Sequence, residues 1–404
     1  MNNTEPEKYY QKAALAVKIT RYIATFLFIV FVLSCIFIFR SDITVENIQY
    51  LMKYADFYDN TEVPDSAEIS VNADSESHVF MLRDNLAVVS RSGIGLYEFS
   101  GKKLFNYSLA YSDPGVSSDG RDILVYDITG NEISIFNSFS RVYSQKYPYS
   151  VKAGCINDSG FAIVTNEKTY RSGVIVYNSN YEEVYRWMLS DRYVTAIDLS
   201  SDGTKLLSAS VKSHDGSYDT LITIRDIKKD EILYSAEIMD ELALKIGFSD
   251  DASAVYLITD SMLRFYDGKL EEKSFYKYNQ TKTEKFFVQN QTIILTENKN
   301  LSGNSMTLYG FDFNGNALFT VDADSKITSV CRGKNVMYAL SSRYIYAYSF
   351  TENGNVNFET KFPSDSNFRN ILCDSADRFV AVGTKKALRG QLESLREQQN
   401  NPNT

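Results

Sequence analysis

Few residues of this 404-residue sequence have the types and spacing needed for acid–base or nucleophilic chemistry. Its two histidines, His78 and His214, lie far apart, and neither has a cysteine near it in the sequence. The motifs G-x-S-x-G and H-E-x-x-H and the phosphate-binding glycine loop do not occur. We interpret both histidines as solvated residues, although a ring-shaped fold can bring distant residues together. The sequence therefore predicts no catalytic residue.

Three short acidic clusters raise the question of a calcium site, because Ca²⁺ prefers oxygen ligands. They read "DDAS" (250–253), "DADS" (322–325) and "DSAD" (374–377), and none has the spacing of an EF-hand loop. Aspartates in turns commonly hydrogen-bond their own backbone. We therefore predict turns at these clusters, with no metal and no cofactor. Gly93 and Gly95 are closely spaced, but they open a predicted strand and so indicate a turn.

The four cysteines do not form the pattern of a disulfide framework or a zinc site. Cys35 lies in an apolar segment, which leaves Cys155, Cys331 and Cys373, an odd number without a C-x-x-C pair. Each of the three follows a predicted inner strand. We interpret them as small buried thiols.

The charge balance argues against nucleic-acid binding. The chain has 42 Lys and Arg against 51 Asp and Glu, a net charge of -9, and no long basic run. Its 29 Tyr and 25 Phe favour strands over helices. The triplets Asn106-Tyr-Ser and Asn290-Gln-Thr are weak glycosylation signals, because the motif is common by chance.

The elements that must position these residues follow a repeat. The stretch "DLSSDGTKLLSAS" (198–210) has a Ser-Asp-Gly turn between two alternating runs, which is typical of a strand pair. Equivalent turns recur with steps of 35, 39, 44, 48, 40, 43 and 41 residues, at Asp84, Asp119, Asp158, Asp202, Asp250, Asn290, Gly333 and Asp374. Periods near 40 residues with several strands each are typical of propeller blades.

A second landmark recurs later in each unit. An apolar strand ends in an aromatic or acidic pair before a polar turn, as in "VIVYNSNYEEVY" (174–185). Each unit is thus predicted to form four short antiparallel strands. In the fourth unit these are 193–199, 204–211, 220–227 and 231–238, with a longer loop at 212–219. The sixth unit has another long loop, at 296–305. Only radial stacking buries both faces of such thin sheets.

These units resemble WD-type and related bacterial propeller repeats, in which an Asp-Gly turn precedes the second strand and an aromatic-Asp pair ends the third. Asp119–Gly120, Asp202–Gly203, Arg225–Asp226 and Tyr266–Asp267 match that pattern over roughly residues 77–383. The sequence departs from it in lacking Trp-Asp pairs. The whole layout is similar to uncharacterised single-span membrane proteins of Gram-positive bacteria with a degenerate WD-type or PQQ-like propeller ectodomain. Quinone-dependent propeller enzymes need tryptophan docking motifs, which the single Trp187 does not provide.

We predict an all-β propeller at residues 66–384, with eight four-stranded blades and seven as the alternative. Residues 368–384 supply two strands, and "SAEISVN" (66–72) supplies a strand without a partner of its own. Pairing them in one composite blade would remove two sheet edges. A C-terminal helix and a frayed tail are predicted for residues 385–404.

One segment predicts a transmembrane helix. Residues 22–39, "YIATFLFIVFVLSCIFIF", carry no charge and are bracketed by Arg21 and Arg40. A helix needs about 20 apolar residues to cross a bilayer. A cleaved signal peptide and a buried core helix are the alternatives. The first is disfavoured because no small-residue cleavage site follows the run, and the second because the run lacks a polar stripe.

The flanking charges predict the orientation of this span. Lys8, Lys12, Lys18 and Arg21 precede it, whereas Arg40 and Lys53 are the only nearby cations after it. The positive-inside rule places the tail, residues 1–21, in the cytoplasm and the propeller outside. The reverse orientation is the alternative. Residues 40–65 are predicted to form a partly helical stalk.

Two functions remain open from the sequence alone. The favoured one is a non-enzymatic scaffold in the cell membrane that binds a protein or glycan partner at the cell envelope. Its Tyr-rich loops support this, since Tyr is a favoured contact residue. The alternative is a cell-envelope enzyme with an active site at the propeller axis. Carboxylates, Tyr or His converging on one mouth of the ring would favour the enzyme.

Overall fold

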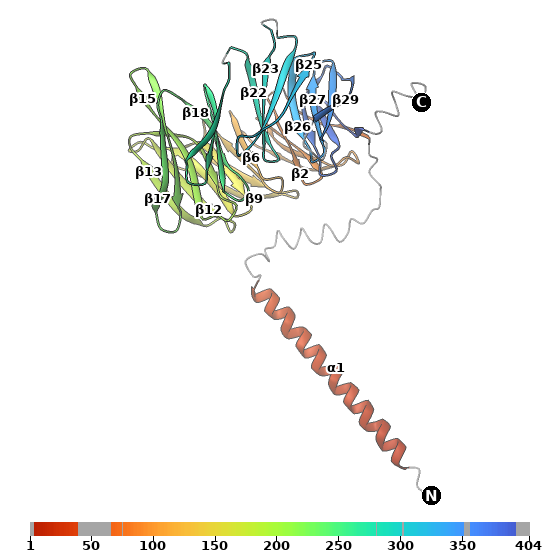
Figure 1. Ribbon diagram of the computed structural model, residues 1–404. Helices are drawn as coiled ribbons and strands as arrows, with labels where there is room; N and C mark the ends of the chain where they lie inside the picture. Colours follow the sequence, from red (N-terminus) through yellow and green to blue (C-terminus); the bar gives the residue numbers. More distant parts are fainter. Residues whose placement is uncertain are drawn as a thin grey trace, which may run out of the picture. The chain divides into compact units, whose positions relative to one another are not determined.

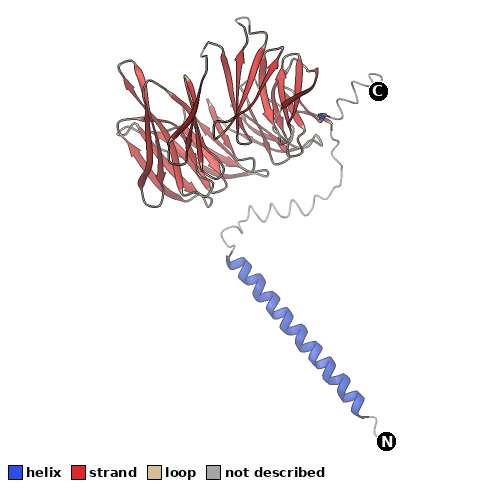
Figure 2. Cartoon of the chain, in the orientation of Figure 1, coloured by secondary structure: helices blue, strands red, loops and turns tan. Residues whose placement is uncertain are grey.

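A computed structural model describes residues 4–38, 66–74, 76–279, 281–300, 303–350 and 356–392 (Figure 1). The chain forms two compact units, Met1–Asn60 and Thr61–Thr404. In the first unit, helix α1 runs from Thr4 to Ile38. In the second, 32 strands form eight four-stranded sheets (Figure 2).

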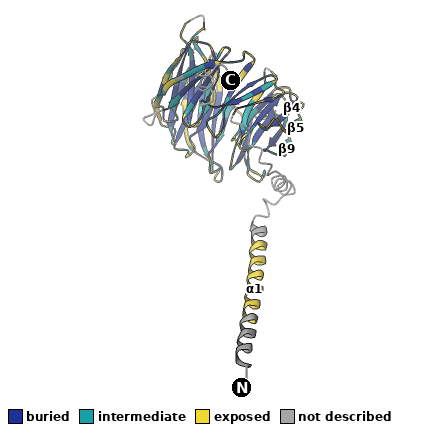
Figure 3. Cartoon of the chain, turned by 90° about the vertical axis from the view of Figure 1, so that its right-hand side faces the viewer, coloured by how far each residue is buried: buried dark blue, intermediate teal, exposed yellow. Residues whose placement is uncertain are grey.

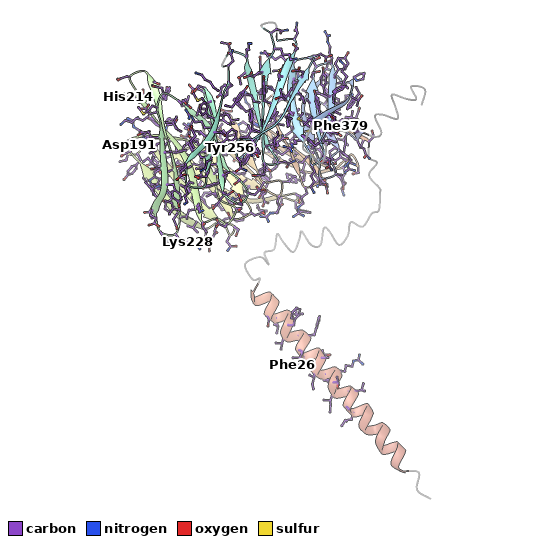
Figure 4. The ribbon with its side chains drawn as sticks, in the orientation of Figure 1. Phe26, Asp191, His214, Lys228, Tyr256 and Phe379 are labelled. Atoms are coloured by element: carbon purple, nitrogen blue, oxygen red, sulfur yellow. The ribbon has the colours of Figure 1, made fainter. Side chains whose placement is uncertain are left out.

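Helix α1 contains the predicted apolar segment. Its stretch Leu15–Ser34 has a mean hydropathy of 1.9, so it is long and apolar enough to cross a membrane. Large apolar side chains on it, such as Phe26, are exposed rather than packed in a core (Figures 3 and 4). The helix begins well before residue 22, where the predicted span starts. The predicted stalk at 40–65 lies outside the described residues.

Seven of the sheets, blades 1 to 7, each contain four strands that are consecutive in the sequence. Blade 1 contains β2 (His78–Leu82), β3 (Asn85–Ser90), β4 (Gly93–Tyr97) and β5 (Lys103–Ser108). Blade 2 contains β6 (Pro114–Ser118), β7 (Ile123–Asp127), β8 (Glu132–Phe136) and β9 (Arg141–Lys146). Blade 3 contains β10 (Ser150–Asn157), β11 (Gly160–Asn166), β12 (Ser172–Asn178) and β13 (Glu183–Leu189). Blade 4 contains β14 (Tyr193–Leu199), β15 (Lys205–His214), β16 (Ser217–Asp226) and β17 (Glu231–Ile238). Blade 5 contains β18 (Ala243–Phe248), β19 (Ala254–Thr259), β20 (Met262–Asp267) and β21 (Glu272–Lys277). Blade 6 contains β22 (Thr283–Gln289), β23 (Thr292–Asn298), β24 (Met306–Asp312) and β25 (Ala317–Ala323). Blade 7 contains β26 (Ile327–Arg332), β27 (Val336–Ser341), β28 (Tyr344–Phe350) and β29 (Val356–Pro363).

Blade 8 is composite, as predicted, and closes the ring. It contains β30 (Phe368–Cys373), β31 (Phe379–Gly383), β32 (Lys386–Gly390) and β1 (Ala67–Ser70). Strand β1 pairs antiparallel with β32, with Ala67 opposite Arg389 and Ser70 opposite Lys386. The prediction of eight blades is therefore confirmed over the seven-blade alternative.

The core consists of eight hydrophobic clusters, and each joins two consecutive blades. The cluster between blades 8 and 1 joins Ile69 and Val380 to Leu86 and Val88. Because both faces of each sheet are covered, the second and third strands read as continuous apolar runs, such as "GFAIVTN" in β11. The outermost strands are mostly exposed or half-buried instead, as in β17, where only Ile238 is buried. Buried residues accordingly run through the blades in Figure 3.

Two of the predicted acidic turns are present. At 250–253, Asp251 accepts a hydrogen bond from the backbone N–H of Ser253 at 3.0 Å. At 374–377, Asp374 accepts one from the N–H of Ala376, also at 3.0 Å. These carboxylates therefore stabilise the turns between first and second strands. Gly93 opens strand β4, where an added Cβ would lie 2.1 Å from the carbonyl oxygen of Tyr107.

Two local predictions were wrong. Residues 386–390 form strand β32, not a helix, because their burial between neighbouring blades outweighs the helix propensity of "KKALRG". Residues 393–404 lie outside the described part. The supposed loop at 212–219 continues strands β15 and β16, which pair as far as His214 and Ser217. Asp215 and Gly216 form the two-residue turn with positive φ that an Asp-Gly sequence favours.

Candidate binding face

The propeller has two different ends. The upper end carries the links between blades and the turns between second and third strands. The lower end carries the turns between first and second strands and between third and fourth strands. His214 is at the upper end of blade 4, Asp191 is in the link between blades 3 and 4, and Lys228 is at the lower end of blade 4 (Figure 4).

Half of the exposed large hydrophobic residues of the described propeller occur at the upper end of blades 3 to 5. Ten large hydrophobic residues are exposed among the described residues of the propeller. Five of them belong to one group, which we call the tyrosine face: Tyr170 (40% exposed), Tyr193 (46%), Tyr218 (46%), Met239 (56%) and Leu244 (52%). The other five lie on outermost strands: Val184, Ile232, Tyr234, Phe275 and Phe358.

The topology explains why the members of the tyrosine face share one end. Tyr170 is in the turn between β11 and β12, and Tyr193 begins β14. Tyr218 is the second residue of β16, next to the hairpin turn. Met239 is in the link between β17 and β18, and Leu244 is the bulged residue of β18. All five positions come from the upper end of three consecutive blades.

The contacts around Tyr193 join blade 3 to blade 4. The guanidinium of Arg171 lies over the Tyr193 ring, 5.1 Å from its centroid. The backbone N–H of Val194 donates to the buried hydroxyl of Ser172 at 3.0 Å. A cation over an aromatic ring stabilises the pair modestly at an exposed site. Tyr193 is thus held on an ordered strand beside a positive charge.

Arg192 fixes the link into blade 4. Its guanidinium donates to the carbonyl of Asp219 at 3.1 Å and to the carboxylate of Glu237 at 2.5 Å. The Asp219 carboxylate in turn accepts from the N–H of Asp240 at 3.3 Å. Asp219 directly follows Tyr218, and Asp240 directly follows Met239. These bonds therefore order the backbone at two members of the tyrosine face.

A buried polar network fixes the link between blades 4 and 5. Thr220 donates to the carbonyl of Glu241 at 2.7 Å and accepts from the N–H of Ala243 at 3.0 Å. The Glu241 carboxylate is almost fully buried and pairs with Arg264 at 2.5 Å. It also accepts from the hydroxyl of Thr259 at 2.8 Å. Losing one partner of such a buried pair is strongly destabilising, so this link is rigid.

The axis also carries ionisable groups, on the first strands of blades 4 and 5. Burial raises the pKa of the Asp198 carboxyl to about 6. Burial also lowers the pKa of Lys245, although the Asp198 charge opposes this. The Lys245 side chain is nevertheless solvent-accessible, as expected for a group on the inner side of a ring.

The contacts of Asp198 indicate a structural role. One carboxylate oxygen accepts from the N–H of Phe248 in blade 5 at 2.8 Å, and the other accepts from its neighbour Leu199 at 2.9 Å. A carboxylate that is already bonded to backbone N–H groups is poorly placed to act as a base. Other polar side chains of first strands join consecutive blades in the same way: Ser117 accepts from Ile156, Gln289 from Arg332 and Ser329 from Ile371.

The structure does not bring the two histidines together. His78 begins β2 in blade 1, whereas His214 is at the hairpin tip of blade 4, with its Nε2 3.5 Å from Asp215. Among the described residues, no group of three His, Cys, Asp or Glu side chains has a geometry suited to a metal ion. The acidic cluster at 322–325 was predicted as a turn, but Asp322 and Ala323 are the last two residues of β25. Asp322 forms an ion pair with Lys299, and Asp324 forms one with Lys361.

Sequence reasoning noted Tyr-rich loops but did not identify the tyrosine face. The signal was present in "NEKTYRSG" and "HDGSYD", where a tyrosine occurs in or next to a polar turn between two strands. Recognising it required knowing which turns share an end of the ring. The predicted loop at 212–219 obscured this further, because Tyr218 belongs to a strand.

Comparisons with known proteins agree with this architecture. The model of the Family of unknown function (DUF5711) matches residues 53–389. The computationally designed Ika8 protein has a similar fold, with a TM-score of 0.60 at 11% identity over 80% of this chain and 99% of that one. The C-terminal WD40 domain of Sif2 has a TM-score of 0.55 at 11% identity, over 80% of this chain and 99% of that domain. BamB from Moraxella catarrhalis has a TM-score of 0.51 at 12% identity, over 80% of this chain and 96% of that one. No curated protein matches the chain.

Proposed function

Because the chain belongs to the DUF5711 family of unknown function, its role has to be inferred from its surface, and we propose that it is a membrane-anchored scaffold. Helix α1 holds it in the cell membrane, and the propeller lies on the extracytoplasmic side. The tyrosine face binds a protein partner. The observation that carries this proposal is that five of the ten exposed large hydrophobic residues of the described propeller occur at the upper end of blades 3 to 5.

The chemistry of the tyrosine face suits protein recognition. Tyrosine, methionine and arginine are enriched in interface cores, and the face contains three tyrosines with Arg171 among them. Aromatic and arginine side chains are also the usual binding hot spots. The polar networks at Arg192 and Glu241 order the backbone in advance, which lowers the entropy lost on binding.

The position of the chain ends supports the same face. Strand β1 enters blade 8 at Ala67, and β32 leaves it at Gly390. Strand β1 is the outermost strand of blade 8, and outermost strands run from the lower end to the upper end, so Ala67 is at the lower end. Strand β32 is the third strand of that blade and runs the opposite way, so Gly390 is also at the lower end. The chain therefore enters and leaves blade 8 at the end opposite the tyrosine face.

Site-specific photocrosslinking in intact cells tests this proposal. A photoreactive phenylalanine analogue would replace Tyr218 in one variant and Tyr234 in another. The two tyrosines are in the same blade, and Tyr234 is outside the tyrosine face. We expect a discrete protein adduct from position 218 that is absent at position 234 and is lost with Tyr193→Ala.

The other outcomes would contradict a specific protein partner. Equal adducts at both positions indicate random collisions. Adducts only with polysaccharide, identified by their sensitivity to glycosidases, indicate that the face binds glycan instead. Absence of any adduct at 218, with the propeller folded as judged by circular dichroism, would exclude the tyrosine face as the contact.

A further inference from the structure

Two of the three cysteines of the propeller meet across the interface of blades 7 and 8. Cys331 is in β26, Cys373 is the last residue of β30, and their sulfur atoms are 2.8 Å apart. That distance is within about an ångström of the 2.05 Å of a disulfide bond. The sequence suggested three unrelated thiols, but residues one blade repeat apart on first strands become neighbours in the ring.

The strands that carry the two cysteines are held together. The N–H of Ile371 in β30 donates to the hydroxyl of Ser329 in β26 at 3.1 Å. Both strands also contribute to the hydrophobic cluster of this interface, through Cys331, Phe368 and Ile371. The thiols therefore face each other across fixed backbone, and a small movement of the side chains would bring the sulfur atoms to bonding distance.

The two thiols differ in accessibility. Cys331 is fully buried, and burial raises the pKa of its thiol. Cys373 is half-buried and lines a cavity of about 490 Å³ at the lower end. Turns of blades 6, 7 and 8 form the cavity, with Asn290, Arg332 and Lys334 on its wall. A reagent can thus reach Cys373 from solvent, whereas Cys331 can react only through Cys373.

We propose that Cys331 and Cys373 form a reversible disulfide that links blade 7 to blade 8. The oxidant is an external disulfide, either a small-molecule disulfide or an oxidised protein dithiol. The Cys373 thiolate attacks one of its sulfur atoms and displaces a thiolate, which gives a mixed disulfide. Cys331 then loses its proton, attacks the Cys373 sulfur and displaces the second thiolate. The protein loses two protons and two electrons, and the external disulfide becomes two thiols.

The bond would reinforce the blade in which the two ends of the propeller meet. Blade 8 takes its outermost strand from the beginning of the propeller and its other three from the end. A covalent link from β26 to β30 ties that composite blade to blade 7. Cross-links of this kind stabilise folds chiefly by restricting the unfolded chain.

Differential alkylation of the full-length protein in detergent tests the proposal. A Cys35→Ala background leaves the three propeller thiols, and the protein is incubated with oxidised glutathione. Peptide mapping should then show a Cys331–Cys373 cross-linked peptide, with the Cys155 peptide still reduced. We expect the Tm to rise by roughly 5–10 °C on oxidation and to return after dithiothreitol.

Matched variants separate the alternatives. Cys155→Ser removes a buried thiol of blade 3 and should leave the cross-link and its Tm shift unchanged. Cys331→Ser should stop the reaction at a glutathione adduct on Cys373. A stable adduct on Cys373 in the background protein, with Cys331 still alkylatable after denaturation, would overturn the proposal. So would complete resistance of both thiols while the protein stays folded.

Discussion

Replacing Asp198 should change how the stability of the propeller depends on pH. The pKa of this carboxyl is about 6 in the folded protein, against 3.8 for an ordinary aspartate. Between these values the folded state keeps a proton that the unfolded state has lost. The stability of the wild type should therefore fall as the pH rises from about 4 to 6.

The size of the effect follows from the difference between the two pKa values. A difference of about two pH units at about 1.4 kcal/mol per unit gives about 3 kcal/mol. Asp198→Asn cannot ionise, so it should gain stability relative to the wild type by up to this amount between pH 4 and 7. The variant also loses one backbone hydrogen bond, which costs about 1 kcal/mol at every pH.

Urea denaturation of both proteins at a series of pH values from 4 to 7.5 measures the difference. Burial raises the pKa of Tyr256 and of Cys155, which interact with Asp198, so neither group adds a titration in this window. Parallel stability curves would refute the reasoning.

Asp251→Asn is the matched control for this experiment. Hydrogen bonds from Ser249 and Ser253 lower the pKa of the exposed Asp251 to about 2. This group contributes stability above the pKa of the unfolded state, and the contribution is lost as the pH falls toward 2. The wild type should therefore lose stability relative to Asp251→Asn when the urea series is extended below pH 4 toward pH 2, opposite to the Asp198 case, whereas the two proteins should give nearly parallel curves from pH 4 to 7.5.

Three further perturbations test the anchor, the ring closure and the core. Leu33→Arg should move the protein from the membrane fraction to the soluble fraction, because a charge inside the predicted span, residues 22–39, is costly; unchanged sedimentation with membranes would contradict the predicted anchor. Deleting residues from Phe368 onward should lower the Tm of the whole ring, since blade 8 covers two core clusters; a truncated protein that melts like the intact one would argue against closure by both chain ends. Phe379→Ala should cost about 3–5 kcal/mol, because this ring is 1% exposed and packs against Tyr338 and Phe362. The exposed Phe275→Ala should change the free energy of unfolding much less, and equal losses in urea titrations would contradict the burial argument.

Most of the architecture could be predicted from the sequence, because its signals are local. Each first hairpin turn has an aspartate, asparagine or glycine at a recurring position, and each blade has apolar second and third strands. The predicted strands of the fourth unit agree with β14 and β17 at both ends. Two signals outside the repeats, the unpaired strand at 66–72 and the incomplete last unit, correctly predicted one composite blade.

What the sequence could not supply depends on long-range neighbours. Strand β32 looked helical because lysine, alanine, leucine and arginine favour helices, and only its place between β31 and β1 makes it a strand. The approach of Cys331 to Cys373 requires knowing that first strands of consecutive blades are adjacent. The tyrosine face likewise combines residues from three blades. In each case the deciding information is which segments meet in three dimensions.

The brevity of β1 has a mechanical consequence. Any tension transmitted along the chain from the N-terminal side reaches the ring first at Ala67 and acts on a ladder of four residue pairs, which two further backbone hydrogen bonds, from Val71 to Lys385 and from Ala73 to Thr384, extend. Such a short ladder is the natural point of rupture under load. Pulling would thus detach β1 before any blade made of consecutive strands is disturbed, and the damaged ring would re-form once the force is released and β1 pairs again.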